Sequence, residues 1–379
     1  MSKVKKKNSS SPLVFITGGH ATPATACIAE LRKRGYSNLI YIGQKKSILF
    51  DKNYSSEYRL VTEKLTIPFH SIIAGKFSRF VSFSSFVWLL RLPVGFLQAF
   101  LWHVYYRPSV VLTFGSHVGV PSAFWAWIFK TPVVAHEQTV TFGRANKLIH
   151  HFAQTICYSW KAEAFTTQSN AKYVFTGNPV RKEVFHPTTY SFAFSDETKP
   201  LLFITGGNQG AHAINEYVFA HLPLLITSYN LIHQTGSNTL YGDFEKAKEY
   251  ASSINQNGVT YIPKDYLFAD EIAEAYAQAT FLLSRAGANT LTELLILGKK
   301  AVLIPITTSS GNEQFLNAQL LENLGLAVIQ KQESLHHSNI LQVLTELGSQ
   351  AIKHDQVAQL ANMHMQAERK IVDIVASYL

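Results

Sequence analysis

The sequence predicts an α/β protein built from two doubly wound, Rossmann-like domains that face each other. Two observations carry this prediction. Short apolar runs alternate with helical patterns, as expected for parallel strands joined by crossover helices. The chain also opens with an apolar strand that leads into Thr-Gly-Gly at residues 17–19, and the same opening returns at residues 205–207. With 379 residues, 47% of them hydrophobic, the chain can bury two full cores.

The N-terminal half begins with a strand, a glycine turn, a helix and a second strand, for which a right-handed parallel crossover is expected. The expected strands are Leu13–Ile16, Leu39–Ile42, Val110–Thr113, Pro132–Ala135 and Val174–Thr176. The expected helices are 24–34, 121–129 and 142–152, and the expected turn is 115–119. We place the N-terminal domain at residues 1–186 and a linker at residues 187–199.

The C-terminal half repeats the pattern over residues 200–353 and ends in a helical segment, residues 354–379. The expected strands are Leu201–Thr205, Leu231–Gln234, Val259–Ile262, Phe281–Leu283 and Ala301–Pro305. Helices are expected to begin near residues 211, 270 and 290, and one helix is expected to run from 354 to 378.

The stretch from Phe281 to Asn317 carries the strongest chemical signal. It contains a strand, a small-residue turn at 284–289, a helix and a further strand, so the turn lies at the carboxyl ends of the strands. The first amides of such a helix lack partners within the helix and can bind a phosphate. Glu293, one turn in, can accept hydrogen bonds from two ribose hydroxyls. The stretch predicts a site for a nucleoside diphosphate; the alternative is an ordinary turn in which Glu293 is a favourable N-terminal charge.

Composition narrows the function classes. The formal net charge of +9 suits nucleic acid, anionic lipid or phosphorylated substrates, but no nucleic-acid-binding motif accompanies it. Cys27 and Cys157, the two cysteines, lie in apolar stretches, which indicates buried thiols in a reducing compartment. No histidine pair has metal-ligand spacing beside cysteines or carboxylates, so no metal is expected. Residues 1–11 are Lys- and Ser-rich and are expected to be a solvated tail, because the apolar run that follows is too short for a signal peptide.

Residues 75–107 are unusually rich in Phe, Trp, Leu and Tyr and are edged by Lys and Arg. A transmembrane helix is one interpretation, but Arg91 and Pro93 interrupt the apolar run near its middle. Ordinary core helices are a second. We favour a third, an interfacial apolar patch with a basic rim that holds the protein on an anionic bilayer.

A set of short motifs, in order and at plausible spacing, resembles the MurG family of peripheral membrane glycosyltransferases. The matching pieces are TGGH (17–20), HEQ (136–138), GNPVR (177–181), GG-QGA (206–211), HQ-G (233–236), DEIAEAYA (270–277), SRAGANTLTE (284–293) and EQFLNA (313–318). The resemblance implies a GT-B fold, with the UDP-sugar held by the C-terminal half, the lipid acceptor by the N-terminal half, and a last helix that crosses back. It also implies an inverting, metal-independent transfer of N-acetylglucosamine from UDP-N-acetylglucosamine to undecaprenyl-diphospho-muramoylpentapeptide, in peptidoglycan synthesis at the cytoplasmic face of the membrane. No Asp-x-Asp pair is present to hold a divalent ion.

The resemblance also implies site residues. In donor binding these are Thr17, Gly18 and Gly19 across the cleft, Arg181 and Ala269 near the uracil, Asn208 near the phosphates, Ala288, Asn289, Thr290, Leu291, Thr292 and Glu293 at diphosphate and ribose, and Thr139 and Gln314 at the sugar. His117 is expected on the acceptor side. His20 is the favoured catalytic base, because an imidazole at a glycine turn can take the acceptor proton near neutral pH. Its alternative is a structural histidine, and Glu137 is the second candidate base.

The chain departs from the family pattern near the sugar and the acceptor. Thr139 stands in place of Asn, His117 in place of an aromatic residue, and Phe15 and Ile16 in place of small residues or glycine. Two alternatives therefore stay open: transfer of another UDP-linked hexose to diacylglycerol or another polyprenol lipid, and a catalytically weak scaffold subunit. A UDP-sugar epimerase would share the fold but not the aromatic stretch.

Overall fold

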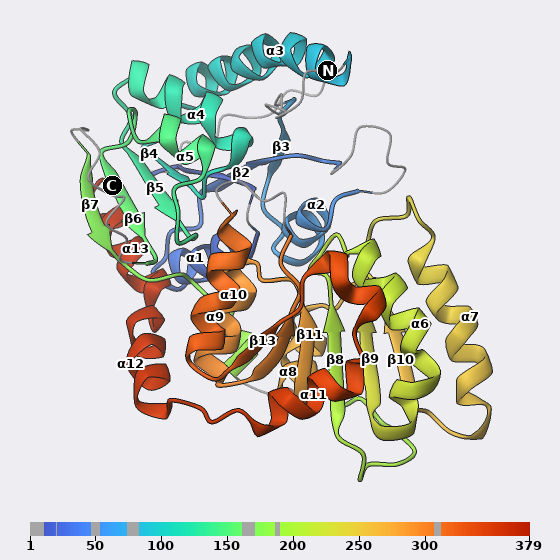
Figure 1. The fold of residues 1–379 in the computed structure, drawn as a ribbon. Helices are drawn as coiled ribbons and strands as arrows, with labels where there is room; N and C mark the ends of the chain where they lie inside the picture. Colours follow the sequence, from blue (N-terminus) through green and yellow to red (C-terminus); the bar gives the residue numbers. More distant parts are fainter. Residues whose placement is uncertain are drawn as a thin grey trace.

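The computed structural model describes residues 11–19, 21–46, 54–73, 83–160, 171–185, 190–306 and 312–379, and at residues 56, 83–91, 182 and 269 it describes the backbone only. Two sheets form two layered domains, one above the other in Figure 1. All pairings in both sheets are parallel. The predicted tail, apart from Ser11, and the start of the aromatic stretch at 75–82 lie outside the described residues.

The N-terminal sheet has seven strands in the order β3-β2-β1-β4-β5-β6-β7. Their bounds are β1 Val14–Thr17, β2 Leu39–Gly43, β3 Phe69–Ser71, β4 Val110–Thr113, β5 Val133–Glu137, β6 Thr155–Tyr158 and β7 Lys172–Phe175. Alternate residues of β1 enter different cores: Val14 and Ile16 pack on one face and Phe15 on the other. The central strands are apolar throughout because helices cover both faces.

Helices of the N-terminal domain divide between these two faces. They are α1 Ala21–Lys33, α2 Ser56–Arg59, α3 Phe83–Tyr106, α4 Ser116–Ile128 and α5 Arg144–Ile149. Helix α1 packs in the core that contains Val14, whereas α3, α4 and α5 pack in the core that contains Phe15. Helix α3 lies along the outer edge of the domain (Figure 1). In the described part of the chain no helix, α3 included, combines the length and hydropathy that a bilayer span requires.

The C-terminal sheet has six strands in the order β10-β9-β8-β11-β12-β13, which is the Rossmann order. The strands are β8 Leu201–Thr205, β9 Asn230–Gln234, β10 Tyr261–Lys264, β11 Ala279–Ser284, β12 Lys300–Leu303 and β13 Ala327–Ile329. The helices are α6 His212–Ser228, α7 Asp243–Ile254, α8 Ala269–Gln278, α9 Ala288–Leu297, α10 Glu313–Asn323 and α11 Ile340–Ser349. The predicted fold class, two facing Rossmann-like domains, is confirmed.

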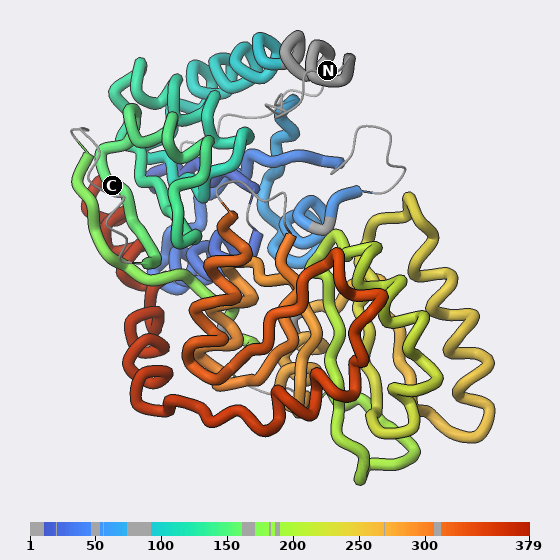
Figure 2. Tube along the Cα trace, viewed as in Figure 1, coloured from blue at the N-terminus to red at the C-terminus, as the bar shows by residue number. Residues whose placement is uncertain are grey.

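The end of the chain returns to the N-terminal domain. Helix α12 (His354–His364) packs on α9, and α13 (Ala367–Ala376) packs on α1, as the tube in Figure 2 shows. Arg34, directly after α1, forms an ion pair with Asp373 on α13. One continuous helix was expected here; instead the chain bends between α12 and α13, where Gln366 adopts a φ of 61° in the left-handed region.

Two local predictions have clear outcomes. Strands β4 and β8 begin and end at the predicted residues. The predicted turn at 115–119 is wrong, because α4 begins at Ser116 and runs through it. Gly115 and Ser116, with φ of 79° and 63°, make the turn, and Pro121, the predicted helix start, lies inside the helix.

Candidate active site

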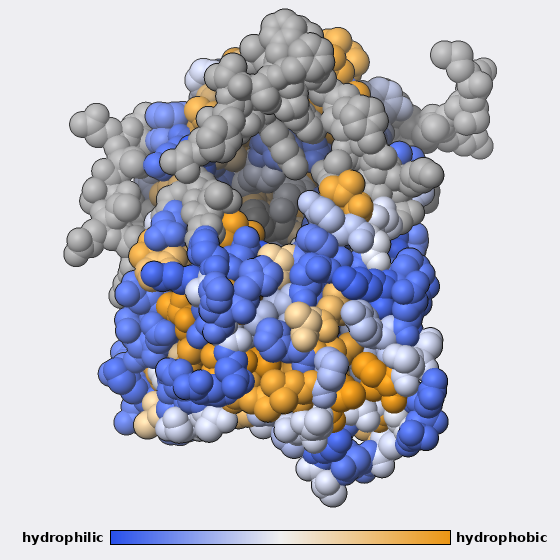
Figure 3. Space-filling view, turned by 45° about the vertical axis from the view of Figure 1, so that its right-hand side comes forward, coloured by the Kyte–Doolittle hydropathy of each residue, from blue (hydrophilic) through white to orange (hydrophobic). Residues whose placement is uncertain are grey.

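A cleft of about 890 Å³ lies between the carboxyl ends of the two sheets. The molecule is visibly hollowed between its upper and lower parts (Figure 3). Of the predicted site residues, the cleft is lined by Gly19, His117, Thr139, Arg181, Asn208, Ala288, Asn289, Thr290, Glu293 and Gln314. The structure thus brings together residues that lie almost 300 positions apart in the sequence.

The first glycine turn follows β1. Thr17 is fully buried and its hydroxyl donates to Thr113 Oγ1 at 2.8 Å, so it does not face the cleft. Gly18 is buried as well, whereas Gly19 is exposed and lines the cleft. The Gly19 amide donates to Glu57 Oε1 at 2.9 Å. Glu57 is a cleft residue that the sequence did not single out, since no motif surrounds it.

His20, the favoured catalytic base, lies outside the described residues. Glu137, the second candidate, is at the end of β5 and is buried. Its carboxylate accepts four hydrogen bonds: from the amide and hydroxyl of Thr139, the Gly143 amide and Asn146 Nδ2, at 2.7–3.0 Å. Burial raises the pKa of Glu137 despite these bonds. The four donors fill the lone-pair positions of the carboxylate, so Glu137 fixes the loop that presents Thr139 to the cleft.

Donor-side predictions converge on the start of α9, which follows Gly287. Ala288, Asn289 and Thr290 open the helix and line the cleft, so its unpaired amides and the positive end of its dipole face the cavity. Leu291 and Thr292 are buried instead and do not line it.

The Glu293 carboxylate accepts hydrogen bonds from two side chains. Its Oε1 accepts from Arg181 Nη2 at 3.0 Å, and its Oε2 accepts from the Tyr276 hydroxyl at 2.7 Å. The Glu293 side chain is only 3% exposed, and that of Arg181 is 16% exposed, so the ion pair is largely desolvated. This arrangement orients the carboxylate toward the cleft. Tyr276 was part of a matching motif, but it had no predicted role.

The second glycine turn packs tightly against the loop after β9. Asn208 lines the cleft, and its carbonyl accepts from the amide and the hydroxyl of Ser237 at 3.1 and 3.0 Å. A Cβ on Gly210 would lie 2.0 Å from the Thr235 carbonyl oxygen, so only glycine fits there. This contact fixes the position of the second glycine turn at the cleft.

Three other predicted residues remain, of which two line the cleft. Gln314 lines the cleft, and its Oε1 accepts from the Ile306 amide at 3.0 Å. Ala269 is the first residue of α8, and only its backbone is described. His117, on the first turn of α4, lines the opposite wall and lies 3.1 Å from Ser116 Oγ through Nδ1.

Asn178, within the motif at 177–181, joins three parts of the molecule. Its fully buried side chain donates to Thr292 Oγ1 at 3.0 Å and to Asn289 Oδ1 at 3.2 Å, at the start of α9. Its backbone amide donates to Nδ1 of His364, where α12 ends, at 3.0 Å. The connection between the domains therefore contacts both the start of α9 and the returning C-terminal segment.

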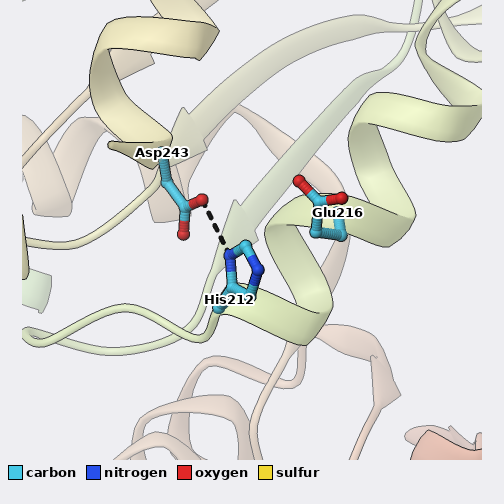
Figure 4. Close-up of side chains that lie close together, drawn as sticks. All are labelled: His212, Glu216 and Asp243. Atoms are coloured by element: carbon cyan, nitrogen blue, oxygen red, sulfur yellow. Dashed lines mark hydrogen bonds and ion pairs between the residues drawn. The ribbon is translucent and has the colours of Figure 1, made fainter. Parts of the chain in front are cut away.

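One group of three potential metal ligands occurs among the described residues: His212 and Glu216 on α6, and Asp243 on α7 (Figure 4). His212 Nδ1 lies 2.9 Å from Asp243 Oδ1. Asn215 donates to Asp243 Oδ2 at 2.7 Å, and Lys246 pairs with Glu216 at 2.8 Å. The carboxylates already have protein partners, and the contacts fasten the start of α6 to the start of α7.

Comparison with known proteins agrees with this geometry. Residues 16–158 match the glycosyltransferase family 28 N-terminal domain, and residues 201–376 match its C-terminal domain. An N-acetylglucosamine transferase of Legionella pneumophila (strain Lens), which acts on N-acetylmuramyl-(pentapeptide) pyrophosphoryl-undecaprenol, is 31% identical over 89% of each chain. The transferase of the same name from Clostridium novyi (strain NT) is 31% identical over 97% of each chain.

Among solved structures, MurG of Acinetobacter baumannii superposes with a TM-score of 0.62 at 21% identity, covering 97% of this chain and 99% of that one. This likeness shows the GT-B fold. Both domains match their family models, the relatives match nearly the whole chain, and the cleft lies between paired Rossmann-like domains. The chain therefore belongs to the MurG family of glycosyltransferases within glycosyltransferase family 28.

Proposed function

We propose that this protein transfers N-acetylglucosamine from UDP-N-acetylglucosamine to a polyprenyl-diphosphate-linked muramoylpentapeptide, the lipid I to lipid II step of peptidoglycan synthesis, with inversion and without a metal. The observation that carries the proposal is the start of α9, which faces the cleft beside Glu293. The named activity of relatives that match nearly the whole chain supports the same substrates.

On the donor side, the diphosphate would lie at the first amides of α9 and at the second glycine turn around Asn208. The Glu293 carboxylate would accept the ribose hydroxyls while Arg181 and Tyr276 hold it in place. The leaving group gains negative charge as the glycosidic bond breaks. Helix and loop amides that are already oriented can stabilise that charge in place of a divalent ion.

On the acceptor side, we assign the general base to His20. Its chain neighbour Gly19 lines the cleft, and an imidazole can accept the proton of the attacking hydroxyl near neutral pH. Glu137 would have to give up one of four hydrogen bonds to act as a base. We therefore assign it the positioning of Thr139, which would contact the sugar. His117 and Gln314 would contact the acceptor and the sugar hydroxyls, respectively.

We also propose that an apolar surface at α3 and α4 lies on the membrane. Large apolar side chains on the described part of α3 are exposed at spacings of three and four residues, among them Leu97 at 57% and Leu101 at 54%. Trp127, Ile128 and Phe129 at the end of α4 are exposed too. Such a surface suits an interfacial helix, and Arg107 and Lys130 add exposed positive charge at the ends of the two helices. This would hold the enzyme peripherally at the cytoplasmic face, on anionic lipid.

Turnover on vesicles would test the proposal. UDP-N-acetylglucosamine and UDP-glucose are each offered with the muramoylpentapeptide polyprenyl diphosphate and with diacylglycerol. The proposal predicts transfer of N-acetylglucosamine to the muramoylpentapeptide lipid alone. Transfer from UDP-glucose, or to diacylglycerol, would instead support the related lipid hexosyltransferase. UDP binding without any transfer would support a scaffold subunit.

A further inference from the structure

A short segment of the N-terminal domain touches both halves of the cleft. Helix α2 continues directly into one π-helical stretch, Leu60–Lys64, and we call residues 56–64 the bridging segment. It is anchored by Val61, which is 1% exposed and packs in the core of α1. Helix α2 lies at the boundary between the two domains (Figure 1). Single π-helical turns often occur at functional sites.

Near its N-terminal end, the bridging segment is hydrogen-bonded to the first glycine turn, at Gly19. Glu57 Oε1 accepts from the Gly19 amide at 2.9 Å and from the Tyr41 hydroxyl at 2.8 Å. A Cβ on Gly18 would lie 2.4 Å from the same oxygen, and a Cβ on Gly43 would lie 3.0 Å from Oε2. The two glycines therefore leave the space that the Glu57 carboxylate fills. The position of Gly19, one residue before His20, depends on this carboxylate.

Farther along, the same segment contacts the C-terminal domain. The Arg59 guanidinium carbon lies 5.9 Å from the ring centre of Tyr266 and 5.7 Å from that of Phe268. Lys64 Nζ lies 4.9 Å from the ring centre of Phe268. Both rings belong to the loop between β10 and α8, and Phe268 immediately precedes Ala269, where we expect the uracil. These are cation–π contacts across the domain boundary.

We propose that the bridging segment couples the two half-sites, with Glu57, Arg59 and Lys64 as positioning residues. Arg59 and Lys64 hold the loop at Tyr266–Phe268, and Glu57, on the same rigid turn, holds Gly19. Closure of the C-terminal domain on the donor therefore sets the geometry of the acceptor-side turn. Because the two ends of the segment lie within nine residues, a shift at one end moves the other. The inference rests on the proposed function, since it assigns donor and acceptor to the two sides.

Hydrogen exchange tests the coupling without an acceptor. Amide exchange is followed by mass spectrometry, with and without UDP, in the wild type and in Glu57→Gln, Arg59→Gln and Lys64→Gln. Glu63→Gln is the matched control, because Glu63 is exposed on the same segment. In the wild type and the control, UDP is expected to protect peptides that cover residues 264–270 and also those that cover 16–19. In Arg59→Gln and Lys64→Gln the protection at 16–19 is lost, and UDP affinity falls about two- to tenfold.

In Glu57→Gln, UDP affinity stays within about twofold of the wild type, because Glu57 does not contact the C-terminal loop, while protection at 16–19 is lost. In a turnover assay, the fold decrease in kcat of the Glu57→Gln, Arg59→Gln double variant is smaller than the product of the fold decreases of the two single variants. The two residues act through one segment, so their effects are not independent. Unchanged UDP-dependent protection at 16–19 in all three variants would overturn the coupling. A wild type that binds UDP and shows the coupling but transfers no sugar would refute the proposed function alone.

Discussion

The junction at His364 makes a quantitative prediction about acid stability. His364 Nδ1 accepts from the Asn178 amide, and its ring packs 4.2 Å from the Trp160 ring. Burial, together with Lys370 and His136, lowers the pKa of His364 to about 4, against about 6.5 in an unfolded chain. Between about pH 6.5 and pH 4, the His364 imidazole is protonated in the unfolded chain but stays neutral in the folded protein. The free energy of unfolding therefore falls as the pH drops from about 6.5 toward 4, by about 2 kcal/mol at pH 5.

Urea unfolding at pH 7.5 and pH 5.0 measures this contribution as a difference between variants. In His364→Asn the amide oxygen can still accept from Asn178 but does not titrate, so the acid loss should shrink by about 2 kcal/mol relative to the wild type. The absolute pH dependence is not diagnostic, because buried carboxyls with raised pKa, such as Glu137, change stability in the opposite sense. His354→Asn, at the exposed start of α12, is the control. An equal loss of unfolding free energy at pH 5.0 in His364→Asn and the wild type would show that protonation of His364 does not cause it.

Three further predictions concern the cleft and the membrane surface. Burial and the nearby Glu137 raise the pKa of Glu313 to about 7. Glu313→Gln should therefore remove an ionisation near pH 7 from the pH profile of kcat/KM. An unchanged pH profile would contradict this prediction. Gly210→Ala should weaken UDP binding at least about tenfold, as measured by calorimetry. The added Cβ would lie 2.0 Å from a backbone oxygen and force the second glycine turn away from the donor. Unchanged UDP affinity would disprove the role of that turn. The double variant Leu97→Glu, Leu101→Glu should reduce cosedimentation with anionic vesicles at least about tenfold. Its kcat on a detergent-solubilised acceptor should stay the same. Cosedimentation equal to that of the wild type would exclude this surface as the membrane-binding surface.

Much of the fold could be predicted because strands buried on both faces leave a strong local signal. The apolar runs at 110–113 and 201–205 coincide with β4 and β8. The two Thr-Gly-Gly turns indicated two related domains, and the order of both sheets agrees. The start of α4 was misplaced because Pro121 looks like a first-turn proline, whereas the helix begins five residues earlier. The bend before α13 depends on Gln366 in a left-handed conformation, which its residue type does not announce.

The lining of the cleft was predictable in part where residues follow a strand end in a motif: Ala288, Asn289, Thr290 and Glu293 line it, whereas Leu291 and Thr292 are buried. It was not predictable where the contact is long-range. Glu57 reaches Gly19 from 38 positions away, and Asn178 reaches Thr292 from 114 positions away. The first contact forms when the N-terminal domain folds, and the second forms only when the two domains are assembled. The burial of Thr17 likewise depends on the neighbouring strand, through Thr113.

A single-turnover measurement with labelled UDP-N-acetylglucosamine tests most directly whether the protein transfers this sugar to a lipid-linked acceptor. Protein in excess over the donor is mixed with vesicles that carry the muramoylpentapeptide polyprenyl diphosphate, in the presence of EDTA. We expect the label to move to the lipid fraction with the wild type, and Glu293→Ala to slow this transfer by at least about a hundredfold. Label that remains on the nucleotide, or appears as free sugar, would contradict the claim that this cleft transfers N-acetylglucosamine to a lipid-linked acceptor without a metal.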